Sequence, residues 1–167
     1  DKSLSEFSME NSLGGFDFLS CIPGTVGGGI KMNAGCFQRE FKDILISIQA
    51  VNKSGQVISI PAKYINFKYR DSGLSEDLIF LSASFKGFKK DKITIETEIK
   101  LLKEKKEQAQ PTKIMTRGST FKNPINQTKK KVWELIRESV PTDLNFGDAY
   151  ISNKHSNFFI NKKNATS

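Results

Sequence analysis

A glycine-dense segment near the start of the chain constrains its fold more than any other feature. Residues 21–35 read CIPGTVGGGIKMNAG, in which Pro23 and Gly24 predict a turn. Thr25 is a typical N-cap residue for a helix that runs toward Met32, and the last glycine of the segment is expected to end that helix.

The three glycines at positions 27–29 remove side chains from this part of the surface. A flat or bulky ligand can therefore approach the backbone closely. The free N–H groups at the start of the helix suit a phosphate or an electron-rich ring edge. The spacing matches neither the dinucleotide-binding fingerprint nor the P-loop, and the Lys-Ser or Lys-Thr pair that a P-loop requires does not follow the glycines. A purely structural glycine turn is the alternative.

Apolar runs separated by turn residues predict a sheet in the middle of the chain. Residues 44–51 and 56–60 flank a turn at 52–55 and predict a hairpin. Residues 78–85 predict a third strand. From Lys92 to Leu102, apolar and polar residues alternate, which predicts a further strand with one solvated face.

The two ends of the chain are less regular. The residues up to about Phe18 show no convincing element, whereas 129–140 predict a helix and 157–161 a short buried strand. The expected apolar face of that helix consists of Val132, Leu135, Ile136 and Val140. The elements in this order predict two sheet-containing halves.

A polar stretch over residues 103–110 is followed by Pro111 and indicates a domain boundary. We place the two domains at residues 1–108 and 109–167. The formal net charge is +8, with lysines concentrated at 86–92, 100–106 and 129–131. Because acidic residues stand among these lysines and Phe88 is the one aromatic residue within the three segments, the pattern favours a solvated surface. Nucleic-acid binding and an anionic substrate are the alternatives.

The cysteine and histidine content excludes some classes of site. The chain has two cysteines and one histidine, which argues against a thiolate or imidazole metal cluster and fits a reducing, cytoplasmic setting. No apolar run is long enough for a membrane span, and no segment has the pattern of a secretion signal.

The sequence Tyr69-Arg70-Asp71-Ser72 precedes a predicted strand. The planar guanidinium of Arg70 is suited to holding a carboxylate. The alternative is a surface arginine paired with Asp71.

A second polar motif covers residues 117–124, RGSTFKNP. Ser119 offers a hydroxyl and Asn123 an amide, but no histidine is near in sequence and the surroundings of Ser119 are not a G-x-S-x-G elbow. A hydroxyl without a base is better suited to giving a proton than to attacking a carbonyl. The motif therefore points away from hydrolysis.

Taken together in this order, these segments resemble the UDP-N-acetylenolpyruvoylglucosamine reductase (MurB) family. Each is weak alone, but the ordered set spans nearly the whole chain. The segments that carry the resemblance are 18–28, 32–35, 69–72, 110–111, 118–124 and 154–161.

The resemblance implies an α+β fold. It would comprise the second half of an FAD-binding domain of the PCMH/vanillyl-alcohol-oxidase type, followed by part of the family's C-terminal α+β domain. It further implies that NADPH reduces FAD and that the flavin passes hydride to the enolpyruvyl double bond of UDP-N-acetylglucosamine enolpyruvate. The product would be UDP-N-acetylmuramate, a peptidoglycan precursor.

The resemblance also implies roles for individual residues. Arg70 would stabilise developing negative charge and Ser119 would donate the proton. His155 is expected to be structural. Substrate contacts would come from Tyr69, Lys122, Asn123 and Lys154. Flavin contacts would come from Ile22, Pro23, Gly24, Thr25, Gly27, Gly28, Asn33, Ala34 and Gly35.

By the same resemblance, the chain is expected to begin after the loop that grips the FAD pyrophosphate. It is expected to end before a glutamate that assists Arg70. These 167 residues alone would then bind FAD weakly and show little turnover. We expect a cytoplasmic monomer without nucleic-acid or membrane partners. The alternatives are a basic nucleic-acid-binding module and a flavin-fold oxidoreductase that acts on another substrate.

Overall fold

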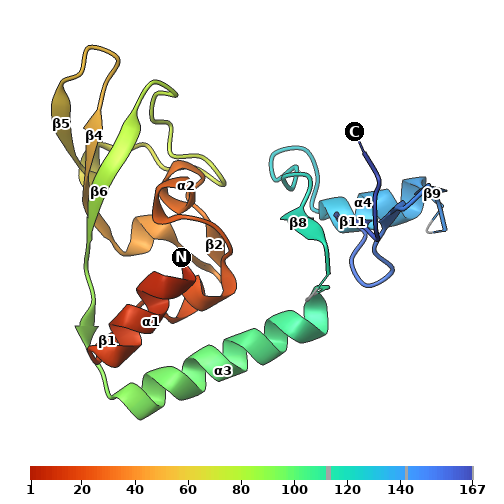
Figure 1. The fold of residues 1–167 in the computed structure, drawn as a ribbon, viewed down its shortest axis with the longest axis horizontal. Helices are drawn as coiled ribbons and strands as arrows, with labels where there is room; N and C mark the ends of the chain where they lie inside the picture. Colours follow the sequence, from red (N-terminus) through yellow and green to blue (C-terminus); the bar gives the residue numbers. More distant parts are fainter. Residues whose placement is uncertain (112–113, 142, 167) are drawn as a thin grey trace. The chain divides into compact units, whose positions relative to one another are not determined.

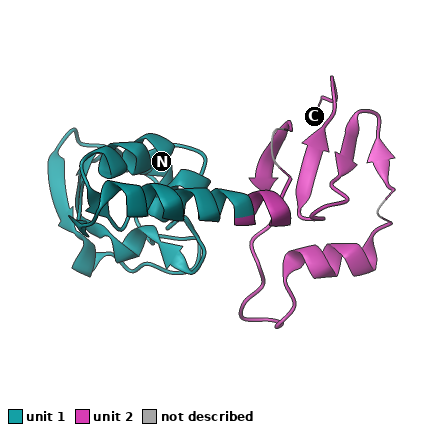
Figure 2. Ribbon diagram, turned by 90° about the horizontal axis from the view of Figure 1, so that it is seen from below, with its two compact units in different colours: residues 1–104 teal, residues 105–167 magenta. Residues whose placement is uncertain are grey.

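The structure is a computed structural model that describes residues 1–111, 114–141 and 143–166. The chain divides into two compact units, residues 1–104 and 105–167 (Figure 2), and each is described by itself. Helix α3 (Lys92–Ala109) crosses this division, and the expected boundary after residue 108 falls at its last residue. Within the described ranges, none of the helices has the length and hydropathy that a membrane crossing requires.

The first unit combines short helices with three small antiparallel sheets (Figure 1), so the expected α+β class is confirmed. Short 3-10 turns lie at Asp17–Cys21, Phe41–Asp43 and Ala62–Tyr64. The other elements before α3 are α1 (Lys2–Glu10), β1 (Leu13–Gly14), α2 (Val26–Lys31), β2 (Gly35–Cys36), β3 (Arg39–Glu40), β4 (Leu45–Val51), β5 (Val57–Pro61), β6 (Ile79–Phe85) and β7 (Phe88–Lys89).

The expectation that the first residues form no element was wrong, because they form α1. The inward face of this helix carries the small residues Ser5 and Ser8, which are buried. The hydroxyl of Ser8 donates a 2.7 Å hydrogen bond to the carbonyl of Leu4. Because two of the inward-facing positions beside Leu4 are serines and Phe7 is exposed, the usual hydrophobic periodicity of a helix is weak.

The expected hairpin is confirmed by β4 and β5, which pair antiparallel and form a three-stranded sheet in the order β5-β4-β6. In the turn, Asn52 Oδ1 accepts hydrogen bonds from the backbone N–H groups of Ser54 and Gln56, both at 3.0 Å. Gly55 adopts φ +77°, which a glycine tolerates without strain. The expected third strand is β6, antiparallel to β4.

The strand expected from Lys92 to Leu102 was wrong, because these residues begin α3. Asp91 starts the helix by accepting hydrogen bonds from both the backbone N–H and the hydroxyl of Thr94, at 2.9 and 3.1 Å. Ile95 and Ile99 are buried at helical spacing, whereas Ile93 is 73% exposed. The alternating isoleucines fit both the two-residue period of a strand and the 3.6-residue period of a helix, and the cap at Asp91 favours the helix.

Helix α2 begins as expected, because the Thr25 hydroxyl accepts a 3.2 Å hydrogen bond from the N–H of Gly28. The expectation that Gly35 ends the helix was wrong. The helix ends at Lys31, and the residue with left-handed backbone is Asn33, at φ +39°. Asparagine adopts this conformation more readily than most residues. Gly35 instead begins the β2–β3 hairpin.

The hydrophobic core of the first unit lies beneath β4 and around α2. Phe18, Leu19, Phe41 and Ile48 are fully buried, and Ile30 of α2 is 1% exposed. A Cβ added at Gly29 would lie 2.3 Å from the ring of Phe41, so this glycine is required by packing rather than by ligand access.

The second unit contains a four-stranded antiparallel sheet in the order β8-β11-β10-β9. The expected helix is α4 (Val132–Ser139), three residues later at its start and one earlier at its end than predicted. The expected strand at 157–161 is confirmed as β11 (Phe158–Asn161), in which Phe158 and Ile160 are buried. The remaining strands are β8 (Thr116–Ser119), β9 (Asn145–Phe146) and β10 (Ala149–Ile151).

Candidate functional site

Arg70 lies in a tight turn between the 3-10 turn at 62–64 and β6. Lys68 and Asp71 form an isolated antiparallel bridge around it, and Arg70 itself adopts φ +55°. Ser72 is completely buried, and its N–H donates a 3.1 Å hydrogen bond to the carbonyl of Lys31 at the end of α2. The turn is therefore fixed against α2.

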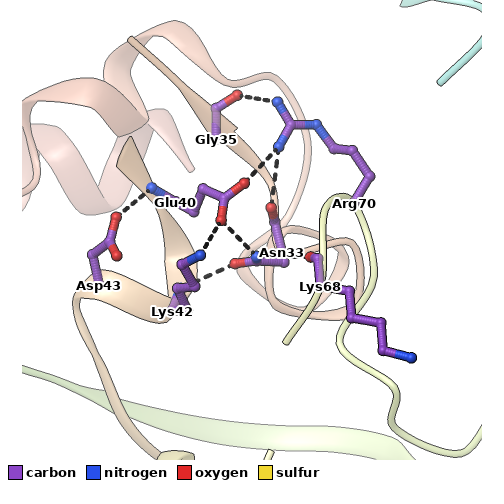
Figure 3. A network of polar contacts seen from close by, with 7 residues as sticks. All are labelled: Asn33, Gly35, Glu40, Lys42, Asp43, Lys68 and Arg70. Atoms are coloured by element: carbon purple, nitrogen blue, oxygen red, sulfur yellow. Dashed lines mark hydrogen bonds and ion pairs between the residues drawn. The ribbon is translucent and has the colours of Figure 1, made fainter. Parts of the chain in front are cut away.

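The guanidinium of Arg70 lies against the backbone that follows α2 (Figure 3). Nη2 donates to the carbonyl of Gly35 at 2.8 Å, and Nη1 donates to the carbonyl of Asn33 at 3.3 Å. Glu40 supplies a carboxylate 3.4 Å from Nη1. The guanidinium also lies over the ring of Tyr69, 4.9 Å from its centroid.

Asn33 is the hub of this network, and it is completely buried. Its amide nitrogen donates to Glu40 Oε2 at 2.9 Å and to the carbonyl of Lys68 at 3.0 Å. Its amide oxygen accepts from the N–H of Lys42 at 3.1 Å. These bonds join α2, the β2–β3 hairpin and the Arg70 turn. The buried side chain of Asn33 thus holds these three segments together beneath Arg70.

The glycine segment leaves an open strip of backbone, which is the observation that fits a flat cofactor. Pro23, Gly24 and Thr25 are exposed, and a Cβ added at Gly24 would meet nothing within 4 Å. At Gly27 the nearest atom would be 3.7 Å away, in Phe80. At Gly28 it would be 3.3 Å away, in the hydroxyl of Thr25. The residues on this strip suit the close approach of an isoalloxazine ring.

Gly35 differs from those glycines. A Cβ at this position would lie 2.2 Å from the carbonyl oxygen of Arg39. The absence of a side chain is therefore required by the β2–β3 hairpin. The carbonyl of Gly35 serves the site by accepting from Arg70. The other expected flavin contacts, Ile22 and Ala34, are half-buried and pack against the core of the first unit.

Ser119 is exposed at the end of β8, in the second unit, and Gly118 before it adopts φ +88°. The buried Asn157 holds the chain that follows. Its amide oxygen accepts from the N–H of Phe121 at 3.0 Å, and its amide nitrogen donates to the carbonyl of Phe121 at 2.9 Å. Its own carbonyl accepts from the N–H of Thr120 at 2.9 Å. Sequence reasoning gave Asn157 no role.

The other expected substrate contacts also lie in the second unit. Asn123 Oδ1 accepts a 3.0 Å hydrogen bond from the N–H of Val132 and so fixes the start of α4. Lys122 is exposed. Lys154 is exposed too, and its ammonium donates to the carbonyl of Glu107. Arg70, Asn33 and Gly35 thus converge in the first unit, whereas Ser119, Lys122, Asn123 and Lys154 belong to the second.

A cavity of about 360 Å³ opens on the second unit, lined by Trp133, Arg137, Asp143, Ser152, Asn153, Lys154, His155 and Ser156. The ring of His155 packs edge-on against Phe158, with 4.9 Å between centroids. Among the residues that the structure describes, its buried Nδ1 has no hydrogen-bond partner. Burial lowers the pKa of His155 below its ordinary value of 6.5.

We expect the stability of the second unit to fall as the pH decreases below about 6.5. Because the pKa of His155 is lowered in the folded protein, the unfolded chain binds a proton more readily in this range. Urea unfolding can be followed by the fluorescence of Trp133, the only tryptophan in the sequence. A His155→Gln variant should show a weaker dependence of the midpoint on pH. An unchanged dependence would mean that other groups control it.

Comparison with known proteins defines the class of each part. An FAD binding domain family matches residues 2–61, and the UDP-N-acetylenolpyruvoylglucosamine reductase C-terminal domain family matches residues 110–167. The chain thus combines an FAD-binding domain with a reductase C-terminal domain. It belongs to the UDP-N-acetylenolpyruvoylglucosamine reductase (MurB) family.

Several relatives carry that name. The chain is 67% identical to the Pelagibacter ubique reductase over 99% of its length and 55% of the relative's, and 42% identical to the Rickettsia typhi reductase over 98% and 55%. The crystal structure of the Thermus caldophilus reductase aligns with a TM-score of 0.85 at 30% identity, covering 97% of this chain and 59% of that one. The chain therefore spans about half the length of the curated relatives it matches.

Proposed function

We propose that the protein containing this chain is an NADPH-dependent flavoenzyme. Its reaction would reduce UDP-N-acetylglucosamine enolpyruvate to UDP-N-acetylmuramate for peptidoglycan synthesis. The observation that carries the proposal is the position of Arg70. Its guanidinium is bound to the carbonyls of Asn33 and Gly35, which lie within the stretch that matches the FAD binding domain family. The names of the relatives supply the substrate. Because both substrates are soluble nucleotides, we place the reaction in the cytoplasm. We further propose that the protein is a monomer.

FAD, when bound, would supply the hydride that it has accepted from NADPH. Pro23, Gly24, Thr25 and Gly28 would line the flavin with exposed backbone. Ile22, Gly27, Asn33, Ala34 and Gly35 would complete that surface or support it from below.

Arg70 would stabilise the charge that appears when hydride reaches one carbon of the alkene. That charge is delocalised into the adjacent carboxylate, and a cation already fixed by backbone carbonyls needs little reorganisation to meet it. Ser119 would donate the proton from its Oγ to the other carbon, which completes the reduction. Its exposure on the strand end is compatible with access to substrate.

The remaining residues would hold the nucleotide sugar. Asn123 and the ammonium groups of Lys122 and Lys154 would hold the diphosphate or the carboxylate, and Tyr69 would provide a further contact. The observed ion pairs of the lysine-rich segments favour the solvated-surface interpretation over nucleic-acid binding. Lys90 pairs with Glu98, and Lys130 pairs with Glu138 at 2.7 Å.

The test is NADPH oxidation by the intact protein with the enolpyruvyl substrate, compared with the lactyl product as a control that lacks the double bond. We expect flavin absorbance in the purified protein and oxidation of NADPH that depends on the enolpyruvyl compound. If no flavin binds, or if NADPH oxidation ignores the substrate, the proposed function is wrong.

A further inference from the structure

Glu40 is the acid that faces Arg70, and no step of the proposed reaction assigns it a role. It lies at the end of β3 and precedes the 3-10 turn at 41–43. Its backbone N–H donates a 2.8 Å hydrogen bond to Asp43 Oδ2, which fixes the main chain at this point. Its side chain is only 19% exposed, so the carboxylate is largely removed from solvent and requires partners.

The two carboxylate oxygens of Glu40 have different partners, as Figure 3 shows. Oε2 accepts from Asn33 Nδ2 and from the ammonium of Lys42, each at 2.9 Å. Because one oxygen is held from two sides, the other is directed toward Arg70 Nη1, at 3.4 Å. The orientation of the carboxylate is therefore set by residues other than Arg70.

The distance between Glu40 and Arg70 is also informative. Charge-assisted N–H···O bonds are usually about 2.7–2.9 Å long, so a 3.4 Å contact attracts the guanidinium without binding it tightly. A close bidentate pair would compete with a substrate carboxylate for the same N–H groups. A looser carboxylate can orient the cation and leave it able to bind another anion.

We propose that Glu40 is a positioning residue for Arg70. Glu40 holds the guanidinium of Arg70 against the Asn33–Gly35 backbone, in the orientation that the reduction requires. This inference rests on the proposed function. The competing explanation is that Glu40 only stabilises the β2–β3 hairpin, where it pairs with Gly35. The two explanations differ in whether the effect of Glu40 depends on Arg70.

A double-mutant cycle on the intact, flavin-loaded protein distinguishes them. The variants are Glu40→Gln, Arg70→Ala and the double variant. The assay is single-turnover reoxidation of the reduced flavin by substrate, because this reaction can be measured even for variants that react slowly. We expect Glu40→Gln to slow reoxidation by on the order of 10-fold when Arg70 is present. It should cause no further loss in the Arg70→Ala background. Equal losses in both backgrounds would overturn the inference.

A second readout does not depend on the flavin. In the cofactor-free protein, Glu40→Gln should lower the urea midpoint more when Arg70 is present than when it is absent, because the pair contributes only if both members remain. Equal shifts in the two backgrounds would contradict the coupling. Should Glu40→Gln fail to fold, Glu40→Asp replaces it in both cycles, since it keeps the charge but shortens the reach toward Arg70.

Asp77→Asn is the matched control, because it also converts an acid of the first unit to an amide and breaks an ion pair, with Lys53 at 2.7 Å. It should leave reoxidation unchanged, and a loss equal to that of Glu40→Gln would overturn the assigned role. If substrate reoxidises the flavin of the wild-type protein but the effects of the two substitutions are additive, only the role of Glu40 is wrong. If the wild-type protein does not reduce the substrate, both the proposed function and this inference fall.

Discussion

Replacing Ser119 with alanine is expected to slow substrate reduction by about 10²- to 10⁴-fold, the range in which general acids contribute. Flavin reduction by NADPH should continue at the wild-type rate, because that half-reaction does not use the proton of Ser119. Stopped-flow measurement of the two half-reactions in the intact protein separates these effects. Ser119 is exposed and ends β8, so loss of its hydroxyl leaves no buried group unsatisfied.

The control for this variant is Ser139→Ala, which removes an exposed hydroxyl from the end of α4 in the same unit. It should leave both half-reactions unchanged. If Ser119→Ala reduces substrate as fast as the wild type, the proton comes from another group. If both half-reactions slow equally, Ser119 acts on the structure and not on proton transfer.

Replacing Gly35 with alanine is expected to destabilise the first unit by about 3 kcal/mol, toward the upper end of the usual cost of overpacking. The new Cβ would lie 2.2 Å from the carbonyl oxygen of Arg39 and 3.0 Å from the Cα of Glu40. Both atoms belong to the backbone of the β2–β3 hairpin and cannot turn aside as a flexible side chain would. Urea unfolding followed by circular dichroism measures the change.

Gly27→Ala is the matched control for stability. Gly27 lies in α2, and the nearest atom to an added Cβ is 3.7 Å away, which is ordinary contact. Alanine is the better helix former by about 1 kcal/mol, so this variant should be as stable as the wild type or slightly more stable. Equal destabilisation by the two substitutions would mean that the close approach of the Arg39 carbonyl is not the reason why Gly35→Ala lowers stability.

The parts of the fold that could be predicted from the sequence are those with local signals. The turn around Gly55 and the cap at Thr25 are specified by residues within a few positions of each other. Helix α1 could not be predicted, because serines form its buried face. The segment of α3 predicted a strand because Ile95 and Ile99 fit the two-residue period of a strand as well as the 3.6-residue period of a helix. The capping hydrogen bonds of Asp91 favour the helix.

The candidate site was predictable only where a short motif marked it. The motif around Arg70 and the hydroxyl of Ser119 could be selected from the sequence, and their catalytic roles stay predictions. Glu40 was missed because its contact with Arg70 spans 30 residues and no local pattern marks it. Asn157, which is 36 residues from Phe121, was missed for the same reason. Such pairs are set by tertiary structure.

Position 33 illustrates how narrow the choice of residue becomes when backbone and side chain are both constrained. The left-handed φ of +39° disfavours most side chains, and the three hydrogen bonds need two donors and one acceptor on a short stem. Glycine would accept the backbone but supply none of the bonds, whereas aspartate would direct a carboxylate at the acid of Glu40. Homologous sequences with the same network should therefore vary very little at this position.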